Sequence, residues 1–284
     1  MNIRVERELG AVGAELSGID LSQPLGASTR KEIADAWLKY QVIVFRGQEL
    51  SDEQLVRFSQ SFGLLEKAPI PEKAVGVASM PRLPEVTVVS NVIEDGAPLG
   101  ALGDGELSWH SDMTYIDTPP PASILYSVEV PPSGGDTWFS NMYLAFEALP
   151  QSLKNRISDL KAKHNSSYTS AGTLRRGFEE VDDPSKAPGA LHPIALLHPE
   201  TQKIALYLGR RLNSSIPGLS PSESESVLDE LWAYAENPKF SMAHQWKKGD
   251  IVMWDNRAVM HRRDAFDPAV RRILHRTQLL TFQA

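Results

Sequence analysis

Two histidines and one aspartate occupy positions from which they could hold a metal ion. His110 and Asp112 belong to the tetrapeptide WHSD at 109–112, and side chains two apart in a strand point to the same face. His261 follows the apolar segment 250–255 and is a candidate for a third ligand. Two imidazoles and one carboxylate form a facial triad that leaves three positions open on a metal. The alternatives are a half-buried strand histidine at 110 and a turn or capping histidine at 261.

The absence of cysteine limits the metal chemistry that this chain can support. Disulfides, thiol nucleophiles, iron–sulfur clusters and thiolate zinc sites are excluded, so histidine and carboxylate must hold any metal. Of the seven histidines, His275 is expected to pack on the strand face opposite Arg272. Four others lie in polar stretches or precede proline and are expected at turns or on the surface: His164, His192, His198 and His244.

Two arginines near the C-terminus share one face of a predicted strand. By the period-two rule that face consists of Arg272, Leu274, Arg276 and Gln278. Buried guanidinium groups are costly unless anions meet them, so the face predicts anionic ligands, and a bidentate arginine suits a carboxylate. An exposed strand face with solvated arginines is the alternative. Arg210 and Arg211 could reach the same region, but we expect them in solvent.

The elements that would position these residues are mostly short strands. Apolar or alternating runs bounded by turn residues predict strands at 40–45, 86–90, 107–115, 122–130, 136–140, 204–209, 250–255 and 271–282. Amphipathic and capping patterns predict helices at 29–40, from 51 onward, at 141–160 and at 220–236. Many short strands with helices outside the run predict a mainly β fold with helical insertions, as in a β-sandwich or jelly roll.

The length of the chain favours a single domain spanning 1–284, because sandwich and barrel folds often exceed about two hundred residues around one core. Two stretches without a clear period, 67–85 and 165–190, are predicted to be loops. Long loops of this kind serve as lids or as simple surface excursions, and both interpretations stay open for these two.

Charge and hydropathy exclude two classes of partner. The net charge is -7 with a pI near 5.6, and the scattered basic residues form no footprint for a phosphate backbone. The N-terminal residues lack the apolar core of a signal peptide, and no later run is long enough to span a bilayer. We therefore expect a cytoplasmic protein that binds neither nucleic acid nor a membrane.

Six segments spread over nearly the whole chain match one enzyme family: GAELSGIDLSQPL, YQVIVFRGQ, WHSDMTY, GGDTWFSNMYLAFEALP, WDNRAVMH and RRILHRTQ. In these segments the chain resembles the taurine/2,4-dichlorophenoxyacetate dioxygenase family of iron(II)/2-oxoglutarate oxygenases. The resemblance implies a double-stranded β-helix, which is a jelly roll. It also implies iron(II) on His110, Asp112 and His261. The co-substrate 2-oxoglutarate would bind Thr137 and Arg272, and the reaction would consume dioxygen and release succinate and carbon dioxide.

The same resemblance implies that the substrate is a small organic anion, with its acidic group on Arg276. Sulfonate-using relatives have a substrate-binding histidine before the His-x-Asp motif, whereas His110 is the first histidine here, so taurine itself is disfavoured. Glu106 stands where those relatives have an asparagine and could pair with the amine of a zwitterionic substrate. A solvated loop glutamate is the alternative.

The remaining expectations concern the oligomeric state and the alternative functions. Members of the family are commonly oligomeric, so a homodimer or homotetramer is expected. The main alternative is a non-catalytic, cupin-like barrel that binds a metal or small ligand. A barrel of that kind does not need Arg272 and Thr137 at their positions. A halogenase is disfavoured, because those enzymes leave vacant for halide the position that Asp112 fills.

Overall fold

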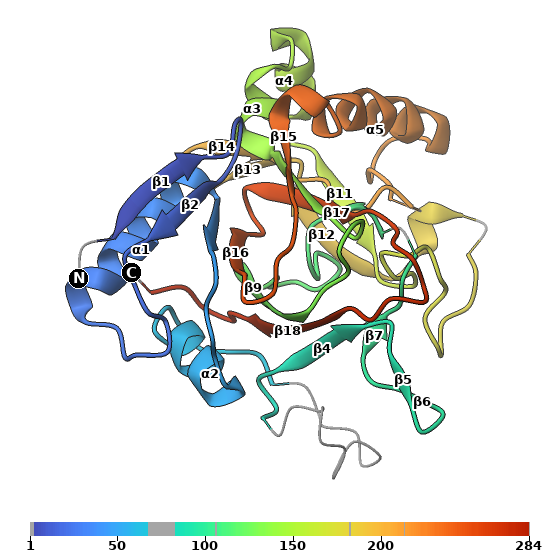
Figure 1. Ribbon diagram of the computed structural model, residues 1–284. Coiled ribbons are helices and arrows are strands. Elements are labelled where there is room, and N and C mark those ends of the chain that lie inside the picture. Colours follow the sequence, from blue (N-terminus) through green and yellow to red (C-terminus); the bar gives the residue numbers. More distant parts are fainter. Residues whose placement is uncertain (1–2, 68–82, 106, 182, 213, 284) are drawn as a thin grey trace.

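The computed structural model describes residues 3–67, 83–105, 107–181, 183–212 and 214–283. The described chain is mainly β, with helices placed between strands (Figure 1). The strands are β1 (Arg4–Glu8), β2 (Ala14–Ser17), β3 (Val42–Phe45), β4 (Thr87–Ser90), β5 (Ile93–Glu94), β6 (Ala97–Pro98), β7 (Ala101–Leu102), β8 (Leu107–His110), β9 (Ala122–Glu129), β10 (Thr137–Asn141), β11 (Lys161–Asn165), β12 (Gly189–Pro193), β13 (Ala195–Leu197), β14 (Ile204–Leu206), β15 (Ser241–His244), β16 (Ile251–Asp255), β17 (Val259–Arg263) and β18 (Ile273–Gln278). The helices are α1 (Ala27–Tyr40), α2 (Asp52–Gln60), α3 (Met142–Glu147), α4 (Gln151–Ile157) and α5 (Pro221–Ala235), with short 3-10 turns η2 (Pro184–Lys186) and η3 (Pro238–Phe240).

Two sheets carry the architecture. The larger has eight strands in the order β1-β2-β3-β16-β9-β18-β4-β7, and the smaller has four in the order β15-β10-β17-β8. In Figure 1 the smaller sheet lies across from β16, β9 and β18. Buried side chains of both sheets, among them Phe139 and Val259 of the smaller and Trp254 and Leu274 of the larger, belong to one cluster. The sheets therefore pack face to face, and their inner faces enclose the region where β8, β17 and β18 meet.

Two central strands of the larger sheet, β3 and β16, are buried on both faces, which explains their continuous apolar sequences. Along β16, Val252 and Trp254 pack toward the smaller sheet, whereas Ile251 and Met253 belong to a second cluster on the outer face. This alternation follows from the two-residue period of a strand. The predicted strands at 40–45 and 250–255 are confirmed as β3 and β16.

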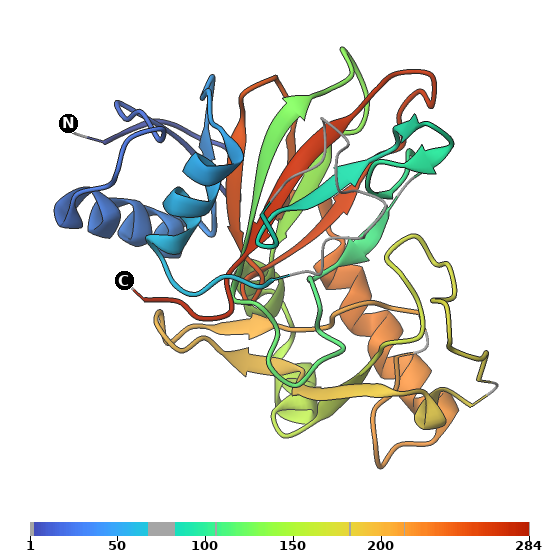
Figure 2. The same cartoon turned by 90° about the horizontal axis from the view of Figure 1, so that it is seen from below.

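Helices α1 and α2 cover the outer face of the larger sheet. Trp37 of α1 and Phe58 of α2 pack in the same cluster as Ile251 and Met253. Helix α2 begins with the predicted capping box, in which the Ser51 hydroxyl accepts from the Gln54 backbone while the Gln54 side chain accepts from the Ser51 backbone. Figure 2 shows both helices together on one side of the strands, away from α5.

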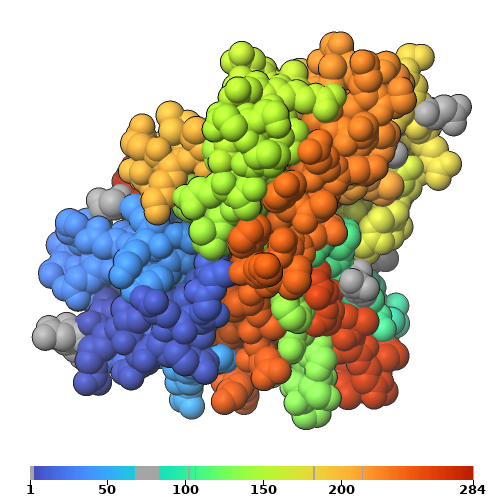
Figure 3. All heavy atoms as spheres, turned by 90° about the horizontal axis from the view of Figure 1, so that it is seen from above, coloured from blue at the N-terminus to red at the C-terminus, as the bar shows by residue number. Residues whose placement is uncertain are grey.

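Helices α3, α4 and α5 pack with the outer face of the smaller sheet. Met260 of β17 belongs to a cluster with side chains of all three helices, including Tyr143, Leu153 and Leu231. In the space-filling view of Figure 3 these helices form one continuous mass beside the N-terminal strands. The helices predicted at 141–160 and 220–236 are confirmed as α3 with α4, and α5. Because Met260 faces the helices, His261 next to it faces the interior between the sheets.

The two predicted loops differ in how much of them the structure describes. Most of 67–85 lies outside the described residues. The stretch 165–190 is largely irregular, apart from η2 and the adjoining ends of β11 and β12. Among the helices that the structure describes, none combines the length and apolar character needed to cross a bilayer.

Candidate active site

The predicted metal ligands meet where β8 lies against β17. In this antiparallel pair His110 is the direct partner of His261, and partners on one face of a sheet have neighbouring side chains. The expectation that His110 and Asp112 share one strand is wrong, because β8 ends at His110 and Asp112 lies in the following turn. That turn includes Met113, whose φ is 51°. The carboxylate is thus brought beside the histidines by a turn and not by strand alternation.

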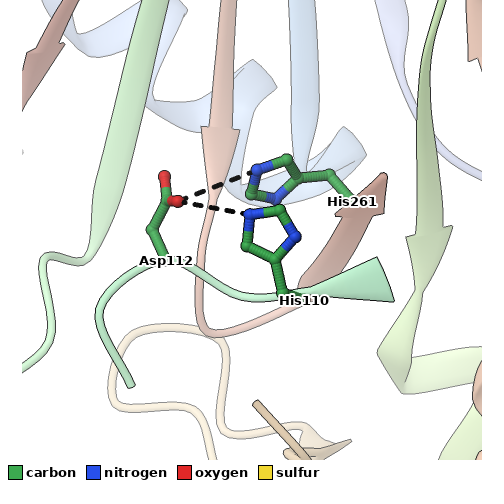
Figure 4. Close-up of side chains that lie close together, drawn as sticks. All are labelled: His110, Asp112 and His261. Atoms are coloured by element: carbon green, nitrogen blue, oxygen red, sulfur yellow. Dashed lines mark ion pairs between the residues drawn. The ribbon is translucent and has the colours of Figure 1, made fainter. Parts of the chain in front are cut away.

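The three side chains converge on one point (Figure 4). Asp112 Oδ1 lies 3.7 Å from His110 Nε2 and 3.8 Å from His261 Nε2. One ligand atom of each residue can be chosen so that all three lie within 4.8 Å of one another. Two imidazole nitrogens and a carboxylate oxygen at these separations form a donor set that suits a divalent metal such as iron.

Hydrogen bonds fix which oxygen of Asp112 faces the histidines. Asp112 Oδ2 accepts from Ser123 Oγ at 2.7 Å and from Gln278 Nε2 at 3.3 Å. Ser123 Oγ in turn accepts from Asn256 Nδ2 at 3.0 Å. Among the described residues Oδ1 accepts no hydrogen bond from protein, so it is the oxygen available to a metal. Such outer contacts hold a ligand in its binding orientation.

The histidines are also oriented for binding. His110 Nδ1 lies 2.8 Å from the carbonyl oxygen of Ser108, so this nitrogen carries the proton and donates it, which leaves the lone pair on Nε2. The His261 ring packs 4.2 Å from that of His110 and 4.9 Å from that of Trp254, measured between centroids. Packing on both sides restricts rotation of the His261 ring.

Electrostatics favour the protonation states that a metal site needs. Burial lowers the pKa of His110 well below its ordinary value, and burial also lowers the pKa of His261. Burial alone would raise the pKa of Asp112, but electrostatic interaction with His261 and Arg276 and the Ser123 hydrogen bond outweigh it and lower that pKa. At neutral pH the site therefore presents neutral imidazoles and an ionised carboxylate.

The three side chains open onto a cavity of about 320 Å³. Its lining contains five arginines and two carboxylates, those of Glu66 and Asp112. The arginines are Arg175, Arg210, Arg263, Arg272 and Arg276. Cations in such excess predict anionic ligands.

Arg272 and Thr137 both line this cavity, and both lie against Trp246. Arg272 is only 2% exposed, and its guanidinium lies 5.9 and 5.7 Å from the ring centroids of Trp246 and Phe266. Among the described residues, the guanidinium makes one hydrogen bond, a long one of 3.4 Å to the Gly135 carbonyl. Burial, and then the charge of Arg263 nearby, lower the pKa of Arg272 to about 9.

Thr137 presents a hydroxyl to the same part of the cavity. Its Oγ1 accepts a hydrogen bond from Trp246 Nε1 at 2.9 Å, so the hydroxyl proton is left to donate to a ligand. Arg276 lies nearer the ligand set, with its Nη1 4.0 Å from Asp112 Oδ1. The cavity thus brings together all the predicted site residues except Glu106, which lies outside the described residues.

Several expectations about other residues are wrong. Three histidines predicted at turns or on the surface, His164, His192 and His244, are buried in β11, β12 and β15. His198 does lie at a turn, the one between β13 and β14, but it is buried as well. Each is covered by packing between distant segments, such as the 2.9 Å contact of His198 Nε2 with Asp255 Oδ2, which local sequence cannot reveal. Arg210 lines the cavity instead of standing in solvent. His275 lies opposite Arg272 as expected, with its Nδ1 2.6 Å from Asp52 Oδ1 of α2.

Sequence reasoning missed the residues that support the ligands. Gln278 could have been found from the sequence, because the period-two pattern puts it on the strand face of Arg272 and Arg276. The sequence points to Ser123 less clearly, as a serine near the start of the apolar strand β9. Arg175 and Tyr115 also line the cavity, and no local pattern distinguishes them from surface residues.

Comparison with known proteins gives one consistent family. Residues 5–278 match the model of the taurine catabolism dioxygenase TauD, TfdA family. The alpha-ketoglutarate-dependent 2,4-dichlorophenoxyacetate dioxygenase of Cupriavidus pinatubonensis is 34% identical, over 96% of this chain and 95% of the relative. Pentalenolactone F synthase of Streptomyces arenae is 31% identical, over 93% of this chain and 90% of the relative. A crystal structure of AAD-2 in complex with Mn(II) and N-oxalylglycine superimposes with a TM-score of 0.80 at 30% identity, covering 98% of this chain and 97% of the other.

Proposed function

The chain belongs to the TauD, TfdA family of dioxygenases, and we propose that it is an iron(II)- and 2-oxoglutarate-dependent dioxygenase that oxidises a small organic anion. The observation that carries this proposal is the convergence of His110 Nε2, His261 Nε2 and Asp112 Oδ1 in a buried cavity. The same cavity contains a guanidinium, that of Arg272, which is buried without a carboxylate partner among the described residues. A metal site and an anion site are therefore adjacent.

His110, Asp112 and His261 are the proposed iron ligands. They fit the metal because their facing atoms are free of competing protein hydrogen bonds within the described chain, while Ser108 and Ser123 hold the opposite edges of His110 and Asp112. Three protein ligands leave three positions open for co-substrate and dioxygen.

Arg272 and Thr137 are proposed to bind the distal carboxylate of 2-oxoglutarate. A buried guanidinium and a hydroxyl with a spare proton provide a charge-assisted site for a carboxylate. The structure of AAD-2 was solved with N-oxalylglycine, an analogue of 2-oxoglutarate, which supports the assignment at the level of the family. A simple metal-binding barrel would not need Arg272.

Arg276 is proposed to bind the acidic group of the substrate. It lines the cavity next to Asp112, so an anion on its guanidinium would lie close to the metal position. Relatives named for phenoxypropionate, 2,4-dichlorophenoxyacetate and sulfate esters support an anionic substrate. Pairing of Glu106 with a substrate amine stays a prediction.

The part of the protein in catalysis is to hold geometry and exclude water. Iron(II) with 2-oxoglutarate, when bound, supplies the activation of dioxygen that oxidises the substrate and yields succinate and carbon dioxide. Ser123 and Gln278 hold Asp112 in place, and apolar residues such as Leu125 and Trp254 wall the cavity. The two arginines position anions on a site already shaped for them.

The proposal extends to the sheet architecture, the loops and the oligomeric state. We infer that the facing sheets form the double-stranded β-helix of the family, within a single domain. We also infer that the loop which contributes Thr169, Ser170 and Arg175 to the cavity lining acts as a lid. A homodimer or homotetramer is expected, which light scattering on the purified protein would test.

The proposed function is tested by succinate release. Purified protein with iron(II), ascorbate and 2-oxoglutarate is screened against aryloxyalkanoates, sulfonates, sulfate esters, amino acids and neutral analogues. The expected result is succinate formation stimulated by anions and abolished in Asp112→Ala. Binding of metal and N-oxalylglycine without turnover of any compound would favour the non-catalytic barrel, and unchanged turnover in Asp112→Ala would refute the ligand set.

A further inference from the structure

A second pair of arginines approaches the metal ligands from another side. The backbone at Arg210 pairs with that of His110 in an isolated antiparallel bridge, and the nitrogen of Ser111 donates to the carbonyl of Gly209 at 3.2 Å. Arg210 is therefore beside His110, whereas Arg276 is beside Asp112.

Arg175, from the stretch 165–190, joins Arg210 at this position. The two guanidinium carbons lie 4.1 and 5.4 Å from the ring centroid of Tyr115, respectively. Both groups donate to one acceptor, the carbonyl of Tyr168, at 3.3 Å from Arg175 Nε and 2.7 Å from Arg210 Nη1. Since they share a ring and an acceptor, the two like charges are neighbours.

These two charges lack the partners that neighbouring arginines have. Among the described residues no carboxylate forms an ion pair with Arg175 or Arg210, and the buried Nε of Arg210 has no hydrogen-bond partner. Arg211, next in the chain, instead contacts Glu225 and Asp229. Cation–π contact with Tyr115 and one neutral carbonyl compensate only part of the cost of bringing two cations together in a cavity.

The pair opens onto the cavity, where Thr169 and Ser170 add hydroxyl groups to the lining. An anion there would meet two guanidinium groups, a favourable arrangement for a carboxylate, sulfate or phosphate oxygen. It would be distinct from the distal carboxylate of 2-oxoglutarate at Arg272, since Arg272 lies against Trp246 and Phe266 whereas the pair lies against Tyr115.

We propose that Arg175 and Arg210 form a second anion subsite, and that the substrate is a small dianion whose two acidic groups bind Arg276 and this pair. The inference rests on the proposed function and narrows its substrate class from anion to dianion. The oxidised carbon would lie between the two acidic groups, because the two arginine positions flank the metal ligands.

The test compares probes that differ by one charge. Protein loaded anaerobically with Mn(II) and N-oxalylglycine, so that the 2-oxoglutarate site is filled, is titrated calorimetrically with unbranched α,ω-dicarboxylates of increasing length. The monomethyl ester of each diacid is titrated in parallel. We expect the best diacid to bind at least about tenfold more tightly than its ester, a difference of about 1.4 kcal/mol.

Variants test whether the preference for the diacid over its ester depends on Arg175 and Arg210. Arg175→Gln and Arg210→Gln should each bring the ratio of ester to diacid dissociation constants close to one. Arg211→Gln, which removes the same charge one residue away and outside the cavity lining, should leave the ratio unchanged. Equal binding of diacid and ester by the wild type, or a ratio that persists in both variants, would overturn the subsite.

A metal-free measurement separates this inference from the proposed function. Sulfate should raise the thermal unfolding midpoint of the metal-free wild type and of Arg211→Gln more than that of the double variant Arg175→Gln/Arg210→Gln. An equal shift in all three proteins would also count against the subsite. Failure to bind Mn(II) and N-oxalylglycine would instead count against the proposed function, and the sulfate result would still decide the subsite.

Discussion

Two groups of buried charges in this protein have different surroundings. Around Asp255 each charge has a partner, because Arg257 donates to both carboxylate oxygens, at 2.9 Å from Nε and 2.8 Å from Nη2, and His198 Nε2 lies 2.9 Å from Oδ2. The pKa of Asp255, which burial would raise, is lowered to about 2 by Arg257 and His198. In the cavity, Arg272 and Arg210 have no carboxylate partner among the described residues.

The difference separates structural charges from functional ones. A closed network such as that of Asp255 needs nothing further and joins β16 to the residues that follow β13. Guanidinium groups without an anionic partner carry a desolvation cost that an anionic ligand would offset. The two carboxylates show the same contrast, because Asp255 uses both oxygens for protein partners while Asp112 keeps Oδ1 for a metal.

The largest effect is expected from breaking the closed network. Arg257→Gln should lower the free energy of unfolding by about 3–5 kcal/mol, because it leaves a buried carboxylate without its main partner. Urea denaturation measures the change. Arg271→Gln is the matched control, since its ion pairs with Glu94 and Glu129 are exposed and such pairs contribute about 0–1 kcal/mol. Equal losses in the two variants would remove the distinction between the regions.

Removing a guanidinium without an anionic partner should affect ligand affinity more than stability. Arg272→Ala is expected to weaken N-oxalylglycine binding to the Mn(II)-loaded protein by about 1.5–3 kcal/mol, because a charge-assisted pair is lost. Its unfolding free energy should fall less than that of Arg257→Gln, since no buried partner is left unpaired. Arg271→Ala, which removes the adjacent exposed cation, serves as control. Unchanged affinity by calorimetry would contradict the assignment of Arg272.

A smaller effect is expected from the support of Asp112. Ser123→Ala removes a hydrogen bond to Oδ2 and should lower metal affinity about 10- to 100-fold, as is usual for outer contacts of a ligand. Ser127→Ala, on the same strand but bonded to the Lys247 carbonyl, controls for the loss of a buried hydroxyl. Metal titration that gives the same affinity in both variants would show that Ser123 does not orient the carboxylate.

The smallest effect concerns pH. In the empty cavity the pKa of Arg272 is about 9, lowered mainly by burial, and an anion bound to it would raise that pKa. As pH rises through 9, the empty protein loses the proton that the bound state keeps, so affinity for N-oxalylglycine should fall by up to about tenfold per pH unit. Calorimetry from neutral to alkaline pH measures this. The decline should be absent in Arg272→Ala, and its persistence there would assign it to another group.

The sequence by itself determined the elements and the residue types of the site. Period-two and capping patterns predicted β3, β16, α2 and α5, because they depend on neighbours a few residues apart. The pattern also put Arg272, Arg276 and Gln278 on one face. Resemblance to a family supplied the roles of the metal and co-substrate residues.

Only the tertiary structure decided which of these side chains meet and which are buried. The register that makes His110 the partner of His261 joins strands about a hundred and fifty residues apart in the chain, and no local pattern encodes it. The turn that carries Asp112, the Ser123 contact that selects its free oxygen, and the meeting of Arg175 with Arg210 also depend on packing between distant segments. Burial is a property of the whole fold, which is why the histidines expected on the surface are enclosed and why the unmet charges of the cavity could be recognised.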